Sequence, residues 1–198
     1  MTSDDERQRL VSAEAWLEQI RSASGSRPGG DPSAVHAIKA RLEKESDQAV
    51  RRQLNLALAS EYKVLGKHDV SERIYLKLFN ESPDEPMPLI LLAGQKLYGE
   101  GDPAAAMHVI DQALVAAFRS GNFRRLGLGV KARIALKQGK FSVVEDVIRL
   151  LLQLQNDPRG VDVGIERDFF DRLPPGAIDE TLALKFAEHA RAAGPSCG

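Results

Sequence analysis

The sequence predicts an all-α protein in which one kind of helix pair recurs along the chain. Gly66, Gly101 and Gly139 each stand within the same pattern of small and apolar residues. The intervals between these glycines are 35 and 38 residues, while the internal pattern is constant, which is typical of a repeat array. Leu, Ala, Arg, Lys, Glu and Gln dominate the composition, and no segment alternates apolar and polar residues as a strand would.

Each repeat has a small residue on its first helix, a glycine, and a small and a large apolar residue on its second helix. The small residues let two helices approach closely, and the glycine ends the first helix in a left-handed conformation. One pair cannot bury its own apolar stripe, so neighbouring pairs must stack. The three repeats are Leu58, Ala59, Tyr62, Gly66, Ser71, Tyr75, Leu78 and Pro83; Ala93, Gly94, Leu97, Gly101, Ala106, Ile110 and Ala113; and Lys131, Ala132, Ala135, Gly139, Val144, Ile148 and Leu151.

This pattern resembles the tetratricopeptide repeat. The match is closest in the first repeat, where Leu58, Ala59 and Tyr62 match the L-G-x-x-Y segment of the family. The resemblance covers about residues 50 to 155, although the family's tryptophan is absent and Lys131 stands where a leucine is usual. It implies a right-handed α–α superhelix, a solenoid of about three repeats with helical caps. A helical bundle with glycines at its helix ends is the alternative architecture.

We expect four segments along the chain. Residues 1–24 form an amphipathic helix, and the Gly-, Ser- and Pro-rich residues 25–31 form a flexible linker. Residues 32–155 form the repeat domain, and 156–198 contain capping helices, one of them over 163–172, and a short flexible tail. The first helix either caps the array or acts as a tethered arm that reaches a partner.

Several helix starts are predicted from capping residues. Asp31, Asp102 and Asp179 each precede a helical pattern, and an aspartate in this place accepts hydrogen bonds from the first backbone amides. Capping boxes predict two further starts, at Asp69 with Glu72 and at Ser142 with Glu145.

The sequence favours a protein without catalysis, metal or cofactor. Its four histidines are scattered, and none stands at metal-ligand spacing with another histidine or a cysteine. The single cysteine, Cys197, lies in a Gly- and Pro-containing tail, where neither catalysis nor metal binding is expected. Neither a phosphate-binding loop nor a nucleophile elbow is present.

The N-terminus is acidic and has no apolar run, so we expect no signal peptide. The apolar stretches are also too short to span a bilayer. We therefore expect a cytoplasmic location.

The resemblance places the first helix of each pair on a concave groove. The family's carboxylate clamp of Lys, Asn and Arg is missing, and the groove is apolar toward the first two repeats and basic toward the third. Such a surface suits an amphipathic helix or an extended peptide with an acidic end. The groove residues that we expect are Gln53, Leu56, Ser60, Lys63, Leu91, Gln95, Tyr98, Leu126, Arg133 and Lys137.

Between Asp111 and Glu145 the chain has seven bases and no acid. The simplest interpretation is a polar face balanced by the acidic residues of the C-terminal segment; an acidic protein partner and nucleic acid are the alternatives. The bases of this patch outside the groove are Arg119, Arg124, Arg125, Lys131 and Lys140. The acidic residues are Asp162, Glu166, Asp168 and Asp171.

These patterns favour a non-catalytic adaptor or scaffold that binds a protein or peptide. A net charge of −1 disfavours nucleic acid or a membrane as the main partner. Three alternatives stay open: polyanion binding through residues 119–140, an enzyme of a helical fold, and self-association into a homodimer through the N-terminal helix and Trp16.

Overall fold

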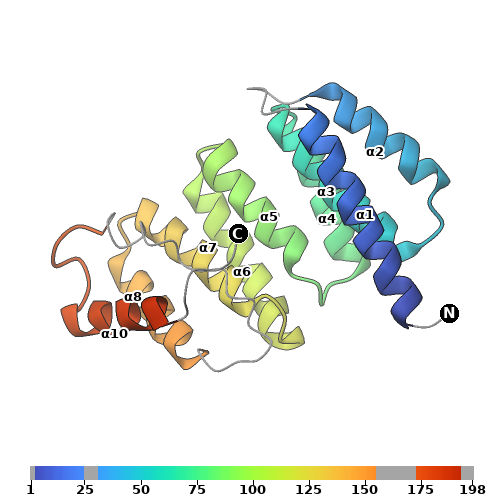
Figure 1. Cartoon of the computed structure of the whole chain (residues 1–198). Helices are drawn as coiled ribbons and strands as arrows, with labels where there is room; N and C mark the ends of the chain where they lie inside the picture. Colours follow the sequence, from blue (N-terminus) through green and yellow to red (C-terminus); the bar gives the residue numbers. More distant parts are fainter. Residues whose placement is uncertain (1–2, 25–30, 155–172, 193–198) are drawn as a thin grey trace. The chain divides into compact units, whose positions relative to one another are not determined.

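The computed structural model describes residues 3–24, 31–154 and 173–192. Within these ranges the chain has nine α-helices, one π-helical turn and no strand, which confirms the all-α prediction for this part of the protein (Figure 1). The linker residues 25–30, the predicted helix 163–172 and the tail beyond residue 192 lie outside the described residues. The chain divides into two compact units, unit 1 from Met1 to Glu81 and unit 2 from Ser82 to Gly198.

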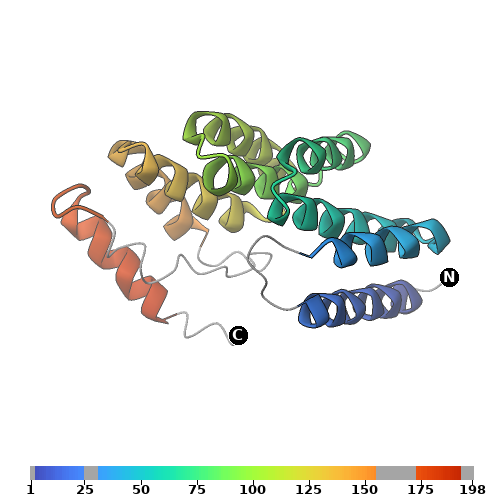
Figure 2. The ribbon, with the colours of Figure 1, turned by 90° about the horizontal axis from the view of Figure 1, so that it is seen from above.

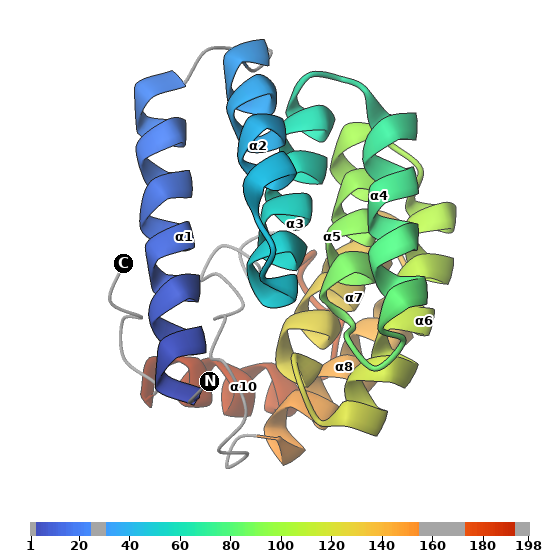
Figure 3. The same cartoon turned by 90° about the vertical axis from the view of Figure 1, so that its right-hand side faces the viewer.

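Unit 1 contains α1 (Ser3–Ser24), α2 (Pro32–Lys44), α3 (Gln48–Val64) and α4 (His68–Glu81). Helices α1 and α2 both contact α3, and α3 packs on α4 (Figure 3). Helix α1 is thus part of the core of unit 1, which corresponds to the cap and not to the tethered arm. The buried core residues are Ala13, Leu17, Val35, Ile38, Val50, Leu54, Ala57, Leu58 and Tyr62.

The Asp47 side chain connects α1 with the start of α3. Its Oδ1 accepts hydrogen bonds from the amides of Ala49 and Val50, at 2.9 and 3.2 Å, and so caps α3. Its Oδ2 pairs with the Arg9 guanidinium of α1 at 2.9 Å. The residue is in the segment that follows α2, so one carboxylate ties α1 to the α2–α3 junction.

Unit 2 contains α5 (Met87–Gly94), the π-turn η1 (Gln95–Gly99), α6 (Pro103–Ser120), α7 (Arg124–Lys137), α8 (Phe141–Gln153) and α10 (Glu180–Ala192). Consecutive helices pack on one another from α5 to α8, α5 also contacts α7, and α10 packs on α8 (Figures 1 and 2). A helix that contacts both the next and the next but one also occurs in unit 1, where α1 contacts α2 and α3. Each unit is therefore built from helices that pack on their neighbours along the chain.

The α10 helix completes the core of unit 2 at the α8 end. Asp179 caps α10 as predicted, because its Oδ1 accepts a hydrogen bond from the Leu182 amide at 2.8 Å. The core side chains of this region are Leu114, Leu128, Ala132, Ala135, Val144, Val147, Ile148, Leu151, Ile178, Leu182 and Phe186.

The three repeat glycines have the conformation that the sequence predicts. Gly66, Gly101 and Gly139 have φ angles of 71°, 70° and 67°, in the left-handed region that a residue with a Cβ enters at a cost. The next helix begins two residues after each glycine, at His68, Pro103 and Phe141. The glycine therefore determines where the second helix of each pair begins.

This start position explains which capping predictions are correct. Asp31 and Asp102 cap α2 and α6 as predicted, and Asp102 is the residue directly after its glycine. The predicted capping boxes at Asp69 and Ser142 are wrong, because both residues stand three positions after the glycine, inside the first turn of α4 or α8. Glu145, the expected partner of Ser142, instead accepts a hydrogen bond from the Asp179 amide at 2.8 Å.

Candidate interaction surfaces

The interface between α3 and α4 shows how a repeat is held together. The Ser71 hydroxyl donates to the Ala59 carbonyl at 2.7 Å, and the hydroxyls of Tyr75 and Ser60 share a hydrogen bond of 3.1 Å. Ser71, Tyr75 and Ala59 are completely buried. Burial raises the pKa of the Tyr75 phenol, an effect that its hydrogen bonds with Ser60 and Ser71 reduce.

The corresponding positions of the other two repeats are also buried. Ala106 and Ile110 on α6 occupy the places of Ser71 and Tyr75, and Val144 and Ile148 occupy them on α8; all four are inaccessible to solvent. The second helix of each pair thus uses these positions for packing, and the residues that can meet a partner lie elsewhere.

The groove residues expected in unit 1 lie on α3 and form what we call the α3 surface: Gln53, Leu56, Ser60 and Lys63. Their spacing of three and four residues places them on one face of the helix. All four are half-buried. The hydroxyl of Ser60 is directed to Tyr75 of α4, so this residue contributes less to the surface than expected.

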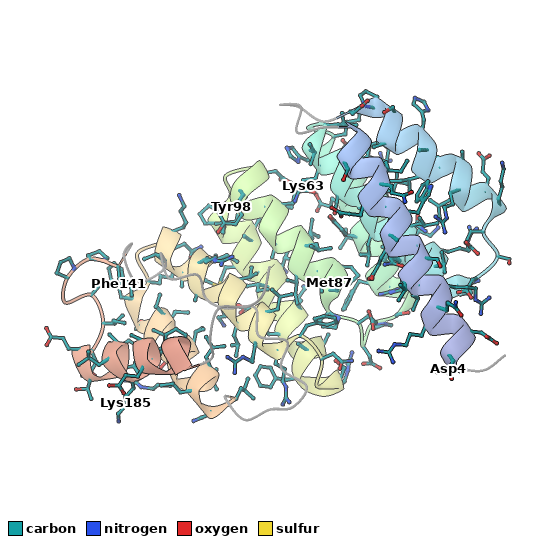
Figure 4. All side chains as sticks on the ribbon, viewed as in Figure 1. Asp4, Lys63, Met87, Tyr98, Phe141 and Lys185 are labelled. Carbon is teal, nitrogen blue, oxygen red and sulfur yellow. The ribbon has the colours of Figure 1, made fainter. Side chains whose placement is uncertain are left out.

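The groove residues expected in unit 2 come from two helices in contact, α5 with its π-turn and α7. We call Leu91, Tyr98, Leu126, Arg133 and Lys137 the α5–α7 surface. Leu91, Leu126 and Arg133 are half-buried, whereas Tyr98 and Lys137 are exposed. Figure 4 shows Tyr98 at the end of the π-turn, far along the helix from Met87 at the start of α5.

The prediction that Gln95 lines the groove is wrong. Its side chain is completely buried, so it is not a contact residue in this structure. Its Nε2 donates to Oε1 of Glu100 at 2.9 Å, and the second oxygen of that carboxylate accepts from Lys96 at 2.9 Å. The π-turn explains why Gln95 is buried. The sequence pattern did not predict this turn, although Gly94 precedes it and Gly99 is its last residue.

The basic patch is largely engaged within the protein. Lys131 pairs with Asp111 at 2.7 Å, and Arg119 pairs with Asp84 and also donates to the Pro83 carbonyl. Arg124 lies over the ring of Phe118 at 5.8 Å, and Arg125 donates to the Leu154 carbonyl at 3.2 Å. Only Lys140, of the five patch residues, is exposed with no contact of this kind among those described. The acidic residues between 162 and 171 that were expected to balance the patch lie outside the described residues.

Two arginines have a structural role that sequence reasoning missed. Arg52 on α3 donates to the Leu78 carbonyl of α4 at 3.0 Å, and Arg125 on α7 donates to the Leu154 carbonyl that follows α8. The two arginines occupy the same position in their repeats, 73 residues apart. Each therefore satisfies a carbonyl at the end of the second helix of its own pair. The equal spacing is the signal that could have identified them.

The described residues offer no metal centre and no membrane span. Among residues 3–24, 31–154 and 173–192, no three His, Cys, Asp or Glu side chains come together in a way that could hold a metal ion. None of the helices in these ranges combines the length and the apolar character that crossing a bilayer requires. Comparison of the chain with family models, curated proteins and solved structures finds no match.

Proposed function

We propose that this chain is a non-catalytic adaptor that binds a peptide or helix of a partner protein on the first helices of a tetratricopeptide-like, right-handed array. The observation that supports this proposal is the common packing of the three helix pairs. In each pair most repeat positions of the first helix are buried: Leu58, Ala59 and Tyr62; Ala93 and Leu97; and Ala132 and Ala135. Gly94, the small residue of the second pair, is half-buried, and so is Lys131 of the third. Because packing uses those positions, the first helix retains a separate face with a mixed apolar and basic character.

The chemistry of the α5–α7 surface indicates the kind of partner. Tyr98 is 60% exposed, and Leu91 and Leu126 are half-buried apolar side chains. Arg133 and Lys137 are one helical turn apart on α7, a helix without any acidic residue. A partner segment with apolar side chains and an acidic end complements such a surface.

Polyanion binding and self-association have less support. Two of the five patch bases pair with acids, Lys131 with Asp111 and Arg119 with Asp84, which reduces the positive charge that residues 119–140 offer to a polyanion. Trp16, the residue expected in self-association, is half-buried and is covered by the Arg41 guanidinium at 4.5 Å from the ring.

Affinity capture with a matched pair of variants tests the proposal. Tyr98→Glu combined with Lys137→Glu changes two exposed residues of the α5–α7 surface. Val115→Glu combined with Lys185→Glu makes the same changes of charge at exposed positions of α6 and α10. We expect a protein that the intact chain and the control pair retain from a source lysate, and that the first pair loses. Identical captures by all three proteins would contradict the proposal.

The captured protein should then bind directly. Titration of its isolated segment into the purified chain separates an apolar groove from a polyanion site. Groove binding weakens only modestly with salt, through screening of the acidic end at Arg133 and Lys137, whereas phosphate-backbone binding weakens steeply as the salt concentration rises.

A further inference from the structure

The first helices of the three repeats end in two different ways. In α3 and α7 the closing hydrogen bonds run from the Lys67 amide to the Tyr62 carbonyl and from the Lys140 amide to the Ala135 carbonyl, both at 2.9 Å. At the corresponding place in the second repeat, the Asp102 amide donates to the Lys96 carbonyl at 2.8 Å, one residue earlier than the pattern requires. The closing hydrogen bond of the second repeat therefore spans one more residue, and most of the π-turn lies within this span.

The different ending changes the exposure of the side chains. Tyr98 is 60% exposed, whereas Lys63 and Leu136, which occupy its place in the other two repeats, are half-buried. Gln95 changes in the opposite direction: it is completely buried, whereas Ser60 and Arg133 at its place are half-buried. The π-turn therefore turns Gln95 inward and Tyr98 outward.

The contacts of Glu100 close this turn. Its amide donates to the Gln95 carbonyl at 3.1 Å, which is the backbone bond of the π-turn. Its carboxylate accepts hydrogen bonds from the side chains of Gln95 and Lys96, each at 2.9 Å. A π-turn is rare and needs a local reason to replace the α-helical register. A carboxylate that binds two side chains of the same turn is such a reason.

We propose that Glu100 is a positioning residue that holds the π-turn and thereby presents Tyr98 to the partner. This inference rests on the proposed function for the role of Tyr98 as a contact. When the carboxylate contacts are lost, the segment adopts the α-helical ending of α3 and α7. Tyr98 then takes the half-buried position of Lys63 and Leu136.

Nitration of the intact protein by tetranitromethane, read tyrosine by tyrosine by mass spectrometry, tests this inference without any partner. Tyr98 is the exposed tyrosine of the three, and the buried Tyr62 and Tyr75 serve as internal references. We expect Glu100→Ala to slow the nitration of Tyr98 about twofold, because the α-helical ending half-buries this position.

Conservative variants separate positioning from a general loss of structure. Glu100→Gln keeps an oxygen that accepts from Gln95, and we expect it to restore most of the wild-type rate. Gln95→Met keeps the side-chain volume but removes the amide, and we expect it to slow nitration as Glu100→Ala does. Glu81→Ala, at an exposed position that ends α4, is the control and should change nothing. Wild-type or faster nitration of Tyr98 in Glu100→Ala would overturn the inference.

The result can be distinguished from a failure of the proposed function. If Glu100→Ala slows nitration but Tyr98→Glu captures the same proteins as the intact chain, the positioning role holds and the adaptor surface is wrong. If Tyr98→Glu loses the partner while Glu100→Ala nitrates like the wild type, the surface is right and Glu100 has no role in it.

Discussion

The first helix pair, α3 with α4, and the second, formed by α5 and the π-turn with α6, have the same spacing of repeat positions but different chemistry at them. In the first pair a serine and a tyrosine hydroxyl make hydrogen bonds across the interface. In the second pair alanine and isoleucine, at Ala106 and Ile110, occupy the same two places, equally buried. The burial of these two positions and the glycine that follows the first helix are common to both pairs. The hydrogen-bonding side chains of the first pair are replaced by apolar ones in the second.

The ends of the two pairs differ as well. Arg52 of the first pair satisfies a carbonyl at the end of α4, whereas Met87 stands at the corresponding position of the second pair. In the second pair the polar contacts are instead concentrated within the first helix, where Glu100 binds Gln95 and Lys96. The hydrogen bonds of Arg52 and Ser71 connect the two helices of the first pair, whereas those of the Glu100 side chain lie within the first helix of the second pair.

The largest expected effect comes from removing the packing of the second pair. Ile110→Ala deletes a completely buried side chain, and we expect the free energy of unfolding to fall by about 2–5 kcal/mol. Val115→Ala on the same helix is the control, because Val115 is 67% exposed and its loss should cost little. Urea unfolding followed by circular dichroism measures both. Equal effects of the two substitutions would show that the stability of the second pair does not depend on the packing of Ile110.

The stability that Tyr75 contributes to the first pair should depend on pH, whereas Ile110 at the same position of the second pair has no group that titrates. Burial raises the pKa of Tyr75 above its usual value of 10.0. The buried neutral phenol therefore contributes its full stability below that value, and the contribution is lost as the pH rises through the raised pKa. Tyr75→Phe should remove this part of the pH dependence. The free energy of unfolding, compared between wild type and variant across this range, tests the expectation; parallel curves would contradict it.

The arginine contacts of the first and third pairs should each have a smaller effect. Replacing Arg52 or Arg125 by methionine, the residue of the second pair, removes a hydrogen bond from a guanidinium to a helix-end carbonyl. We expect each change to cost about 1–2 kcal/mol in urea unfolding. Lys137→Met on α7 is the control, since Lys137 is exposed. A cost for Lys137→Met equal to that for Arg125→Met would show that charge alone matters.

Two glycines provide the smallest effects, of opposite sign. Gly66→Ala places a Cβ on a residue with a φ of 71°, and we expect a loss of about 1 kcal/mol. Gly94→Ala lies in a helix with φ of −61°, where an added Cβ meets no atom within 4 Å. We expect it to stabilise unit 2 by about 0.5–1 kcal/mol, because alanine favours a helix more than glycine does. Thermal unfolding of both variants measures the pair, and a stabilised Gly66→Ala would refute the role of the left-handed turn.

The features that sequence predicted correctly are those that depend on a few neighbouring residues. The left-handed glycines follow from the lack of a Cβ, and the caps at Asp31, Asp102 and Asp179 follow from a carboxylate beside free amides. The buried positions follow from size and spacing. The all-helical fold was predictable for the same reason, because it sums such local preferences.

The features that sequence missed depend on contacts that residue types do not reveal. Asp69 with Glu72 has the composition of a capping box, but the preceding glycine begins the helix too early for it to form. Gln95 has the polarity of a surface residue, but Glu100 provides a partner that makes its burial possible. Arg125 was assigned to a basic surface, because the carbonyl that it binds is 29 residues away along the chain.

Asp47 has a consequence for how unit 1 opens in solution. Its two oxygens bind α1 and the first amides of α3 at the same time, and the residue is only 8% exposed at its side chain. A fluctuation that detaches α1 therefore also leaves a carboxylate without its partner at the start of α3. The amides at that start should then exchange their hydrogens in the same opening event as those of α1, so that α1 and the start of α3 behave as one cooperative unit and do not fray separately.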